Sequence, residues 1–253
     1  MLYIMFFALG IVLGSFYNVV VLRVPIGKPV HKGRSMCPKC SNTLGFLDLF
    51  PVFSWIFLRG KCRYCKVKVS YRYPLIELIT GVLFLFTYHH FGFTYSLIIY
   101  LPFYSMLLMT VIMDFEHMII SLGLLIISSV LSFVGLILAD ADILDSVLGL
   151  VVGGAIYFVI YISAKFVFKK EAFGEGDVYL LAAIGLVLGL RGTLFTSILS
   201  FYTAIIFIVI FKILGKRIKF AQEIAFGPYI CLTAFLVSLF ENEIYDIYRM
   251  VIL

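Results

Sequence analysis

The sequence has 253 residues, of which 63% are hydrophobic and 13% are charged. An average soluble domain has roughly 45–50% apolar and about 25% charged residues, so this composition excludes an ordinary soluble protein. Apolar stretches of about 20 residues recur along the chain, and this is the length of a helix that crosses a hydrocarbon core roughly 30 Å thick. The expected environment is therefore a lipid bilayer.

Eight stretches of the chain are candidate membrane spans. They are residues 2–22, 75–89, 95–113, 118–138, 143–168, 178–190, 194–214 and 225–239. The second and sixth are short for a complete crossing, which a tilted or interfacial position would explain. No Lys or Arg precedes the first stretch, so we expect a retained helix rather than a cleaved signal. The predicted fold is an all-α polytopic membrane protein with about eight transmembrane helices.

The basic residues are concentrated in three segments. Residues 23–74, 165–170 and 212–219 hold all of the 20 Lys and Arg residues except Arg191 and Arg249. Short cytoplasmic loops collect Lys and Arg, so we expect these segments in the cytoplasm and both termini outside. Six acidic residues lie in the opposite loops: Asp140, Asp142, Asp145, Glu241, Glu243 and Asp246. The net charge of +6 therefore reflects topology and attraction to anionic lipid headgroups, and it does not indicate nucleic-acid binding.

Two C-x-x-C pairs lie in the long polar segment between the first two predicted spans, residues 24–74. They are Cys37, Cys40, Cys62 and Cys65, with 21 residues between the pairs. Each pair directs two thiolates toward one tetrahedral ion, so we predict a structural zinc site with no open catalytic position. Two disulfides or free thiols are the alternatives, although disulfides are rare in the reducing cytoplasm. Zinc would fold a loop that has little core of its own.

Asp114 and Asp177 are carboxylates that border predicted spans on the same side of the membrane. Asp114 follows the apolar run that ends at Met113, and Asp177 opens the sixth span after Gly174 and Gly176. Ionisable residues at membrane depth are costly and mark functional sites. Two aspartates from different helices can share one proton, so that one acts as a base on water and the other as an acid. The glycines would leave room for an extended substrate strand.

Simpler roles are open for these acidic residues. Carboxylates at helix starts stabilise the helix dipole or pair with interfacial Lys and Arg, and spacing alone does not decide between the roles. Glu77 and Glu116 also lie near predicted span ends. His117 lies one turn from Asp114, either as its partner or as a solvated interfacial histidine.

Six features of the sequence resemble signatures of the bacterial type IV prepilin peptidases, which are GxGD-type intramembrane aspartyl proteases. They are GSFYNVVVLRVP at 14–25, the pairs CPKC and CRYC, SYRYPLIELITG at 70–81, DFEHMII at 114–120, GEGD at 174–177 and FGPY at 226–229. GxGD alone is weak evidence. Six signatures in the family's order along nearly the whole chain are specific.

The resemblance implies a reaction and the residues that perform it. Asp114 and Asp177 would be the catalytic pair, with Gly174, Gly176 and Glu116 in the active-site neighbourhood. The substrates would be prepilins or pseudopilins, cleaved after the glycine that ends a class III leader. Cleavage would occur at the cytoplasmic face of the bacterial inner membrane, and peptide hydrolysis would need no cofactor.

The resemblance also implies N-methylation of the new terminus by S-adenosylmethionine. It assigns this activity to an N-terminal part, residues 1–90, which includes the first two spans and the zinc-ribbon-like cysteine loop. The six-span remainder, residues 91–253, would be the peptidase part. Glu77 is our candidate for a polar role in methylation. Its pairing with Arg72 or Lys68 at the membrane interface is the alternative.

One segment departs from the family pattern. After Ile120 the family usually has a Pro-Asp pair, whereas this sequence has Ser121 and Leu122. Proline shapes the start of a helix, so its absence bears on local geometry rather than on Asp114 itself.

Two other classes of function are alternatives. A non-enzymatic membrane assembly factor of a pilus, competence or secretion machine would bind partners through the cysteine loop, and its aspartates would only cap helices. A transporter would use the aspartates as proton relays, but no inverted repeat is evident in the sequence. Replacing the aspartates by Asn distinguishes an enzyme from an assembly factor.

Overall fold

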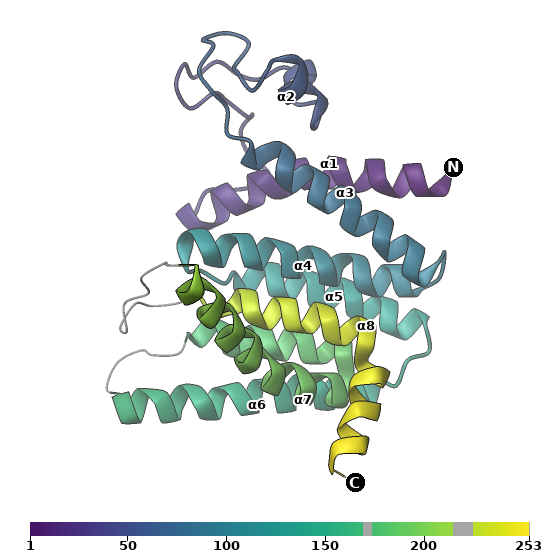
Figure 1. Ribbon diagram of the computed structural model, residues 1–253. Helices are drawn as coiled ribbons and strands as arrows, with labels where there is room; N and C mark the ends of the chain where they lie inside the picture. Colours follow the sequence, from purple (N-terminus) through teal and green to yellow (C-terminus); the bar gives the residue numbers. More distant parts are fainter. Residues whose placement is uncertain (169–173, 215–224, 253) are drawn as a thin grey trace. The chain divides into compact units, whose positions relative to one another are not determined.

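The chain folds into helices over most of its length (Figure 1). The computed structural model describes residues 1–168, 174–214 and 225–252. Its helices are α1 (Leu2–Arg23), α2 (Phe53–Phe57), α3 (Arg72–Phe91), α4 (Ser96–His117), α5 (Leu122–Leu138), α6 (Ile143–Phe168), α7 (Glu175–Ile213) and α8 (Gly227–Ile252). Within these residues β-structure is limited to isolated bridges, so the all-α prediction is confirmed. Five of the basic residues used to predict topology lie outside the described residues: Lys169, Lys170, Lys216, Arg217 and Lys219.

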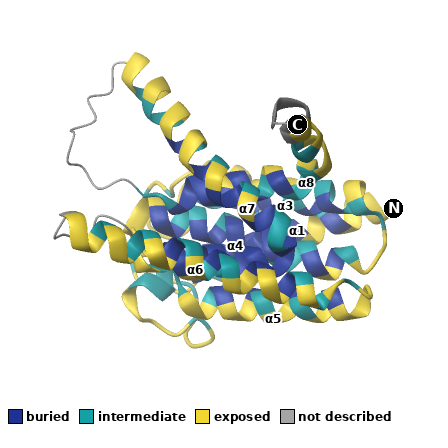
Figure 2. Ribbon diagram, turned by 90° about the horizontal axis from the view of Figure 1, so that it is seen from below, coloured by how far each residue is buried: buried dark blue, intermediate teal, exposed yellow. Residues whose placement is uncertain are grey.

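The helices have the length and composition of membrane spans. Among the described residues, five segments are long and apolar enough to cross a bilayer: Leu2–Ile26, Arg72–Phe91, Ser96–His117, Ile143–Val167 and Glu175–Ile213. α5 is a shorter apolar helix. The outer faces of α5 and α6 are exposed and apolar (Figure 2), as at Ile127 and Phe158. Such faces need lipid rather than water around them, and the prediction of a polytopic membrane protein is confirmed.

The sixth and seventh predicted spans form the two halves of α7, which is broken at Gly189. The backbone there has φ 68° and ψ −175°, a conformation available to glycine. Thr193 Oγ1 lies 2.8 Å from the place that a Cβ would occupy at Gly185. Residues eight apart in a straight helix are about 12 Å apart, so the chain reverses direction at Gly189 (Figure 1). The N–H of Leu190 then donates to Asp145 Oδ1 at 3.2 Å, which caps the second half.

The chain divides into two compact units, Met1–Leu97 and Ile98–Leu253. In the first unit, α1 and α3 approach closely through glycines four residues apart. A Cβ at Gly10 would lie 2.6 Å from a carbonyl oxygen of α3, and a Cβ at Gly14 would lie 2.8 Å from the Cα of Glu77. This is the small-residue packing by which membrane helices associate without a hydrophobic driving force.

The second unit uses the same device between α6 and α7. A Cβ at Gly149 or at Gly185 would overlap the backbone of the other residue. Polar contacts join α4 to its neighbours: the hydroxyls of Tyr104 and Ser238 lie 2.9 Å apart, and Ser132 of α5 donates to a carbonyl oxygen of α4 at 2.8 Å. This packing fixes the ends of α4, α7 and α8, where the candidate site lies.

Candidate active site

Asp114 lies in the last turn of α4, and only 6% of the residue is exposed. The C-terminal end of a helix carries a partial negative charge, so a carboxylate there does not stabilise the helix. The helix-capping alternative therefore does not account for Asp114. A buried carboxylate at an unfavourable position is characteristic of a functional site.

The start of α8 approaches the carboxylate of Asp114 directly. The backbone N–H of Gly227 donates to Asp114 Oδ2 at 3.0 Å. A Cβ at this position would lie 2.7 Å from the same oxygen, so the approach requires glycine. The free N–H groups at a helix N-terminus are suited to binding an anion. Pro228 follows, in the first turn of the helix, where its missing N–H is not needed.

Asp177 lies in the first turn of α7, and 5% of the residue is exposed. Gly174 is the N-cap residue of this helix, and a Cβ there would lie 3.0 Å from Asp177 Oδ2, so the carboxylate turns back toward the N-cap. A carboxylate three residues after the N-cap commonly lies in this position. Helix capping thus fits the direction of the Asp177 side chain but does not account for its burial.

The structure brings the two aspartates together around Ile120. A Cβ at Gly176, next to Asp177, would lie 2.9 Å from the Cβ of Ile120. A Cβ at Gly227, which binds Asp114, would lie 3.4 Å from the Cδ1 of the same isoleucine. The two carboxylates are close enough to interact electrostatically.

The segment that follows Asp114 leads from the end of α4 to the start of α5. Ser121 occupies the N-cap of α5, and its hydroxyl accepts the N–H of Leu124 at 3.4 Å. A serine cap therefore starts the helix at the point where the family usually has proline. Glu116 is exposed, and its carboxylate lies 3.9 Å from His117 Nε2. The structure therefore places Glu116 outside the buried pair.

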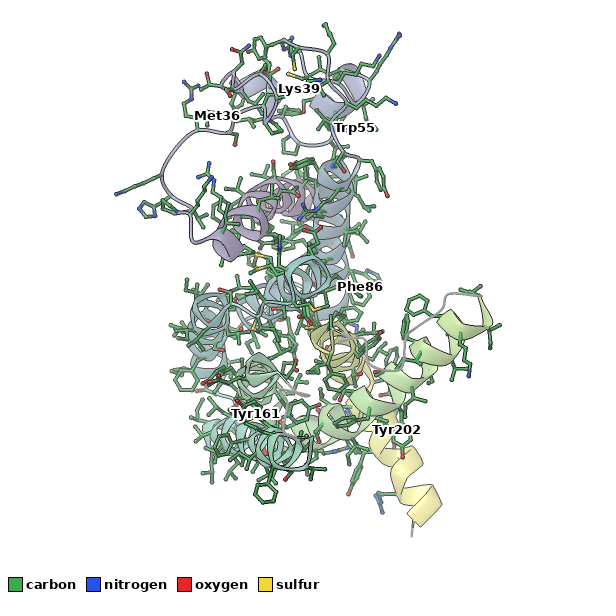
Figure 3. All side chains as sticks on the ribbon, turned by 90° about the vertical axis from the view of Figure 1, so that its left-hand side faces the viewer. Met36, Lys39, Trp55, Phe86, Tyr161 and Tyr202 are labelled. Atoms are coloured by element: carbon green, nitrogen blue, oxygen red, sulfur yellow. The ribbon has the colours of Figure 1, made fainter. Side chains whose placement is uncertain are left out.

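The four cysteines of the loop between α1 and α3 converge on one point. Their sulfurs all lie within 4.8 Å of one another, and the Sγ atoms of Cys37 and Cys65 are 3.8 Å apart. With Zn–S bonds of about 2.3 Å, the sulfurs of a tetrahedral site are ~3.8 Å apart. All four cysteines are free of disulfides. The cluster thus has the dimensions of a four-thiolate metal site. It lies in the same loop as Met36, Lys39 and Trp55 (Figure 3).

The electrostatics of this cluster also fit a cation. Backbone N–H groups of Cys40 and Lys39 lower the pKa of the Cys37 thiol to about 6. The N–H of Asn42 favours the Cys40 thiolate, but burial and the neighbouring Cys37 raise the pKa of Cys40 to about 11. Ionisation of one thiol therefore makes ionisation of its neighbour less favourable. A bound divalent ion would offset this repulsion between thiolates.

Glu77 of α3 anchors the same loop. Its carboxylate is buried, and Oε2 accepts the N–H of Val52 at 2.7 Å. Val52 has φ 61° and ψ −55°, which is rare for a β-branched residue. Within the described part of the chain Glu77 forms no ion pair with Arg72 or Lys68, so the pairing weighed as an alternative is absent.

Comparisons with known proteins cover most of the chain. Residues 8–91 match the family model of the bacterial peptidase A24 N-terminal domain, and residues 101–209 match the type IV leader peptidase family. No solved structure matches the chain.

Several curated relatives share one name, prepilin leader peptidase/N-methyltransferase. The relative from Bacillus subtilis (strain 168) is 31% identical over 250 residues, covering 96% of each chain. That from Stutzerimonas stutzeri is 31% identical over 265 residues, covering 93% of this chain and 90% of its own. That from Myxococcus xanthus (strain DK1622) is 37% identical over 192 residues, covering 74% of this chain and 56% of the relative.

The chain belongs to the type IV prepilin peptidase family. The resemblance inferred from the six signatures is confirmed. Family membership and the membrane helices together make it a multi-pass inner-membrane protein.

Sequence reasoning gave no role to two residues that the structure places at buried carboxylates. Gly227 appeared only as part of the FGPY signature, although a Gly-Pro pair that opens a helix signals a backbone N–H free to bind an anion. Val52 carried no signal, because its unusual conformation depends on contact with Glu77, 25 residues away.

Proposed function

We propose that this chain is a membrane aspartyl endopeptidase that cleaves the leader of type IV prepilins or pseudopilins. The observation that carries the proposal is the pair of buried carboxylates, Asp114 at the end of α4 and Asp177 at the start of α7, grouped around Ile120. The names of the relatives support the substrate class.

Asp114 and Asp177 act as an acid and a base that share one proton, since two adjacent buried carboxylates do not both ionise. The ionised carboxylate takes a proton from a water molecule, whose oxygen adds to the scissile carbonyl carbon. The protonated carboxylic acid donates its proton to the scissile nitrogen, and the C–N bond breaks with its electron pair left on that nitrogen. The leader keeps the new carboxyl group on its terminal glycine, and the amine becomes the mature N-terminus. This hydrolysis needs no covalent intermediate and no cofactor.

The first unit carries the second activity, N-methylation of the new terminus. S-adenosylmethionine supplies the methyl group. The cysteines Cys37, Cys40, Cys62 and Cys65 hold a structural zinc ion, which has no open position for substrate and serves to fold the loop.

The active site faces the cytoplasm, and both termini lie outside. The basic segment from Arg23 to Arg72 supports this orientation, because such segments remain on the cytoplasmic side. Asp114 at the end of α4 and Asp177 at the start of α7 then share that side, and Asp142 and Asp145 at the start of α6 lie on the other.

Asn substitution of each aspartate tests the proposal. Asp114→Asn and Asp177→Asn keep the size of the side chain but remove the acid–base function, so leader cleavage should slow on the order of 10³-fold. The measurement is mass spectrometry of a prepilin co-expressed in membranes, which reports the cleavage position and methylation together. Glu175→Gln is the matched control, because Glu175 belongs to the same GEGD motif but is exposed and bonded to the Tyr179 hydroxyl.

Wild-type cleavage by either Asn variant would contradict the proposal. That outcome is what a non-enzymatic assembly factor predicts. Loss of cleavage in the Glu175→Gln control would instead indicate that the α7 start is merely sensitive to substitution.

A further inference from the structure

Ile120 lies between the two glycines that border the aspartates. A Cβ at Gly176, beside Asp177, would lie 2.9 Å from the Cβ of Ile120 and 3.3 Å from its Cγ1 and Cδ1. A Cβ at Gly227 would lie 3.4 Å from the Cδ1 of the same side chain and 2.7 Å from Asp114 Oδ2. Carbon atoms pack best at about 3.5–4.0 Å, so neither glycine position has room for a side chain.

The backbone holds Ile120 in this place from both sides. The N–H of Met118 donates to the carbonyl oxygen of Asp114 at 3.0 Å, and the N–H of Leu125 donates to that of Ser121 at 3.1 Å. Isoleucine is β-branched, so its side chain has few rotamers. The residue is half-buried, and part of its surface is accessible. Ile120 is therefore a fixed apolar side chain with one side open to a substrate.

A substrate peptide must bring its scissile carbonyl group to both carboxylates. Reacting atoms lie about 3–3.5 Å apart in a productive complex, and Ile120 lies between the glycines beside Asp114 and Asp177. The bound scissile peptide therefore lies against Ile120. In the residue that ends the leader, the Cβ is attached to the atom next to the scissile carbonyl carbon, so this Cβ meets the same crowded side chain. Glycine has no Cβ and avoids the contact.

We propose that Ile120 is a specificity-determining residue that restricts cleavage to leaders ending in glycine. The proposal rests on the proposed peptidase function and names the residue that limits its substrates. Ile120 carries no acid or base, so it takes no part in the proton transfers of Asp114 and Asp177. Its role is steric, because a methyl group on the last leader residue would overlap the Ile120 side chain and move the carbonyl carbon away from the attacking water. A misplacement of about 1 Å costs on the order of 100-fold in rate.

Cleavage of two paired substrates by the full-length protein in membranes tests the proposal. The two prepilins differ only in the last leader residue, Gly or Ala, and kcat/KM is measured for each. The wild type should prefer the glycine substrate on the order of 100-fold. Ile120→Ala should lower this preference at least about tenfold, through faster cleavage of the alanine substrate. Ile120→Val, which removes only Cδ1, should lower it less. Ile119→Ala is the matched control, because this neighbouring isoleucine is exposed, and it should keep the wild-type preference.

Both rates come from one preparation of each variant, so their ratio does not depend on how much of the variant folds. If Ile120→Ala does not accumulate in membranes, the ratio in Ile120→Val decides. An unchanged ratio in the Ile120 variants would show that Ile120 only supports the fold, and equal cleavage of both substrates by the wild type would leave no preference for it to set. Either result overturns the proposal while glycine leaders are still cleaved. A wild-type protein that cleaves neither substrate would overturn the proposed peptidase function itself.

Discussion

In the first unit the polar groups lie in a loop where four cysteines converge, whereas in the second they lie where the ends of three helices meet. The loop has little core: Phe46 and Phe57 within it are each 81% exposed. The helix ends, by contrast, are fixed by backbone contacts so close that only glycine fits, as at Gly227. We therefore expect the first unit to depend on the proposed zinc ion for its shape, whereas the second depends on close backbone packing at glycines.

Removing the metal should have the largest effect, and only on the first unit. Cys62→Ser deletes one of four ligands, and structural zinc binding in small domains contributes about 10–16 kcal/mol to folding. We expect bound zinc, measured by elemental analysis, to fall from one ion per chain to none, and methylation to be lost. Cys231→Ala is the control, because Cys231 lies in α8 and outside the cluster. Full zinc content in Cys62→Ser would contradict the four-cysteine site.

Disrupting the contact between Gly149 of α6 and Gly185 of α7 should destabilise the second unit instead. In Gly185→Ala the new methyl group would overlap the Gly149 backbone, and overpacking of this kind costs about 1–3 kcal/mol or more. Leader cleavage should fall and the thermal transition should shift down, with zinc content unchanged. Gly154→Ala is the control, since its nearest neighbour would be at an ordinary 3.5 Å. Loss of zinc in Gly185→Ala would show that the two units do not fold independently.

Crowding the Asp114 carboxylate should impair chemistry more than stability. In Gly227→Ala a Cβ would lie 2.7 Å from Asp114 Oδ2, which displaces the carboxylate or its backbone donor. A hydrogen bond to a charged group contributes about 1.5–3 kcal/mol, so cleavage should slow roughly 10- to 100-fold. Gly123→Ala, where the space is open, should cleave at the wild-type rate. An unchanged cleavage rate in Gly227→Ala would show that the N-terminus of α8 does not contribute to catalysis.

The features that sequence reasoning predicted are those that depend on local pattern. Apolar length predicted the membrane helices, and C-x-x-C spacing predicted the convergence of Cys37, Cys40, Cys62 and Cys65. The reversal at Gly189 lies next to the boundary between the sixth and seventh predicted spans, which end at 190 and begin at 194. The gap between them is short because a turn between apolar helices needs few polar residues.

The features that sequence reasoning missed arise from contacts between distant segments. The N–H of Gly227 meets a carboxylate 113 residues away, and that of Val52 meets Glu77, so neither local propensity nor charge pattern reports them. Asp114 itself was expected just beyond its helix. The last turn of α4 instead continues to His117, so Asp114 lies at the negative end of the helix dipole. A carboxylate there is destabilised by the dipole rather than stabilised.

The smallest effect should come from the cap that replaces proline. Ser121→Ala removes the acceptor for the Leu124 N–H at the start of α5, and loss of such a cap costs about 1 kcal/mol. The melting temperature should fall by a few degrees, while cleavage stays near the wild-type rate, because Ser121 touches neither carboxylate in the capping geometry. Ser121→Asp, which restores an acceptor, should recover the lost stability. If Ser121→Ala instead slowed cleavage as much as Gly227→Ala, the start of α5 would have to be counted with the helix ends that position Asp114.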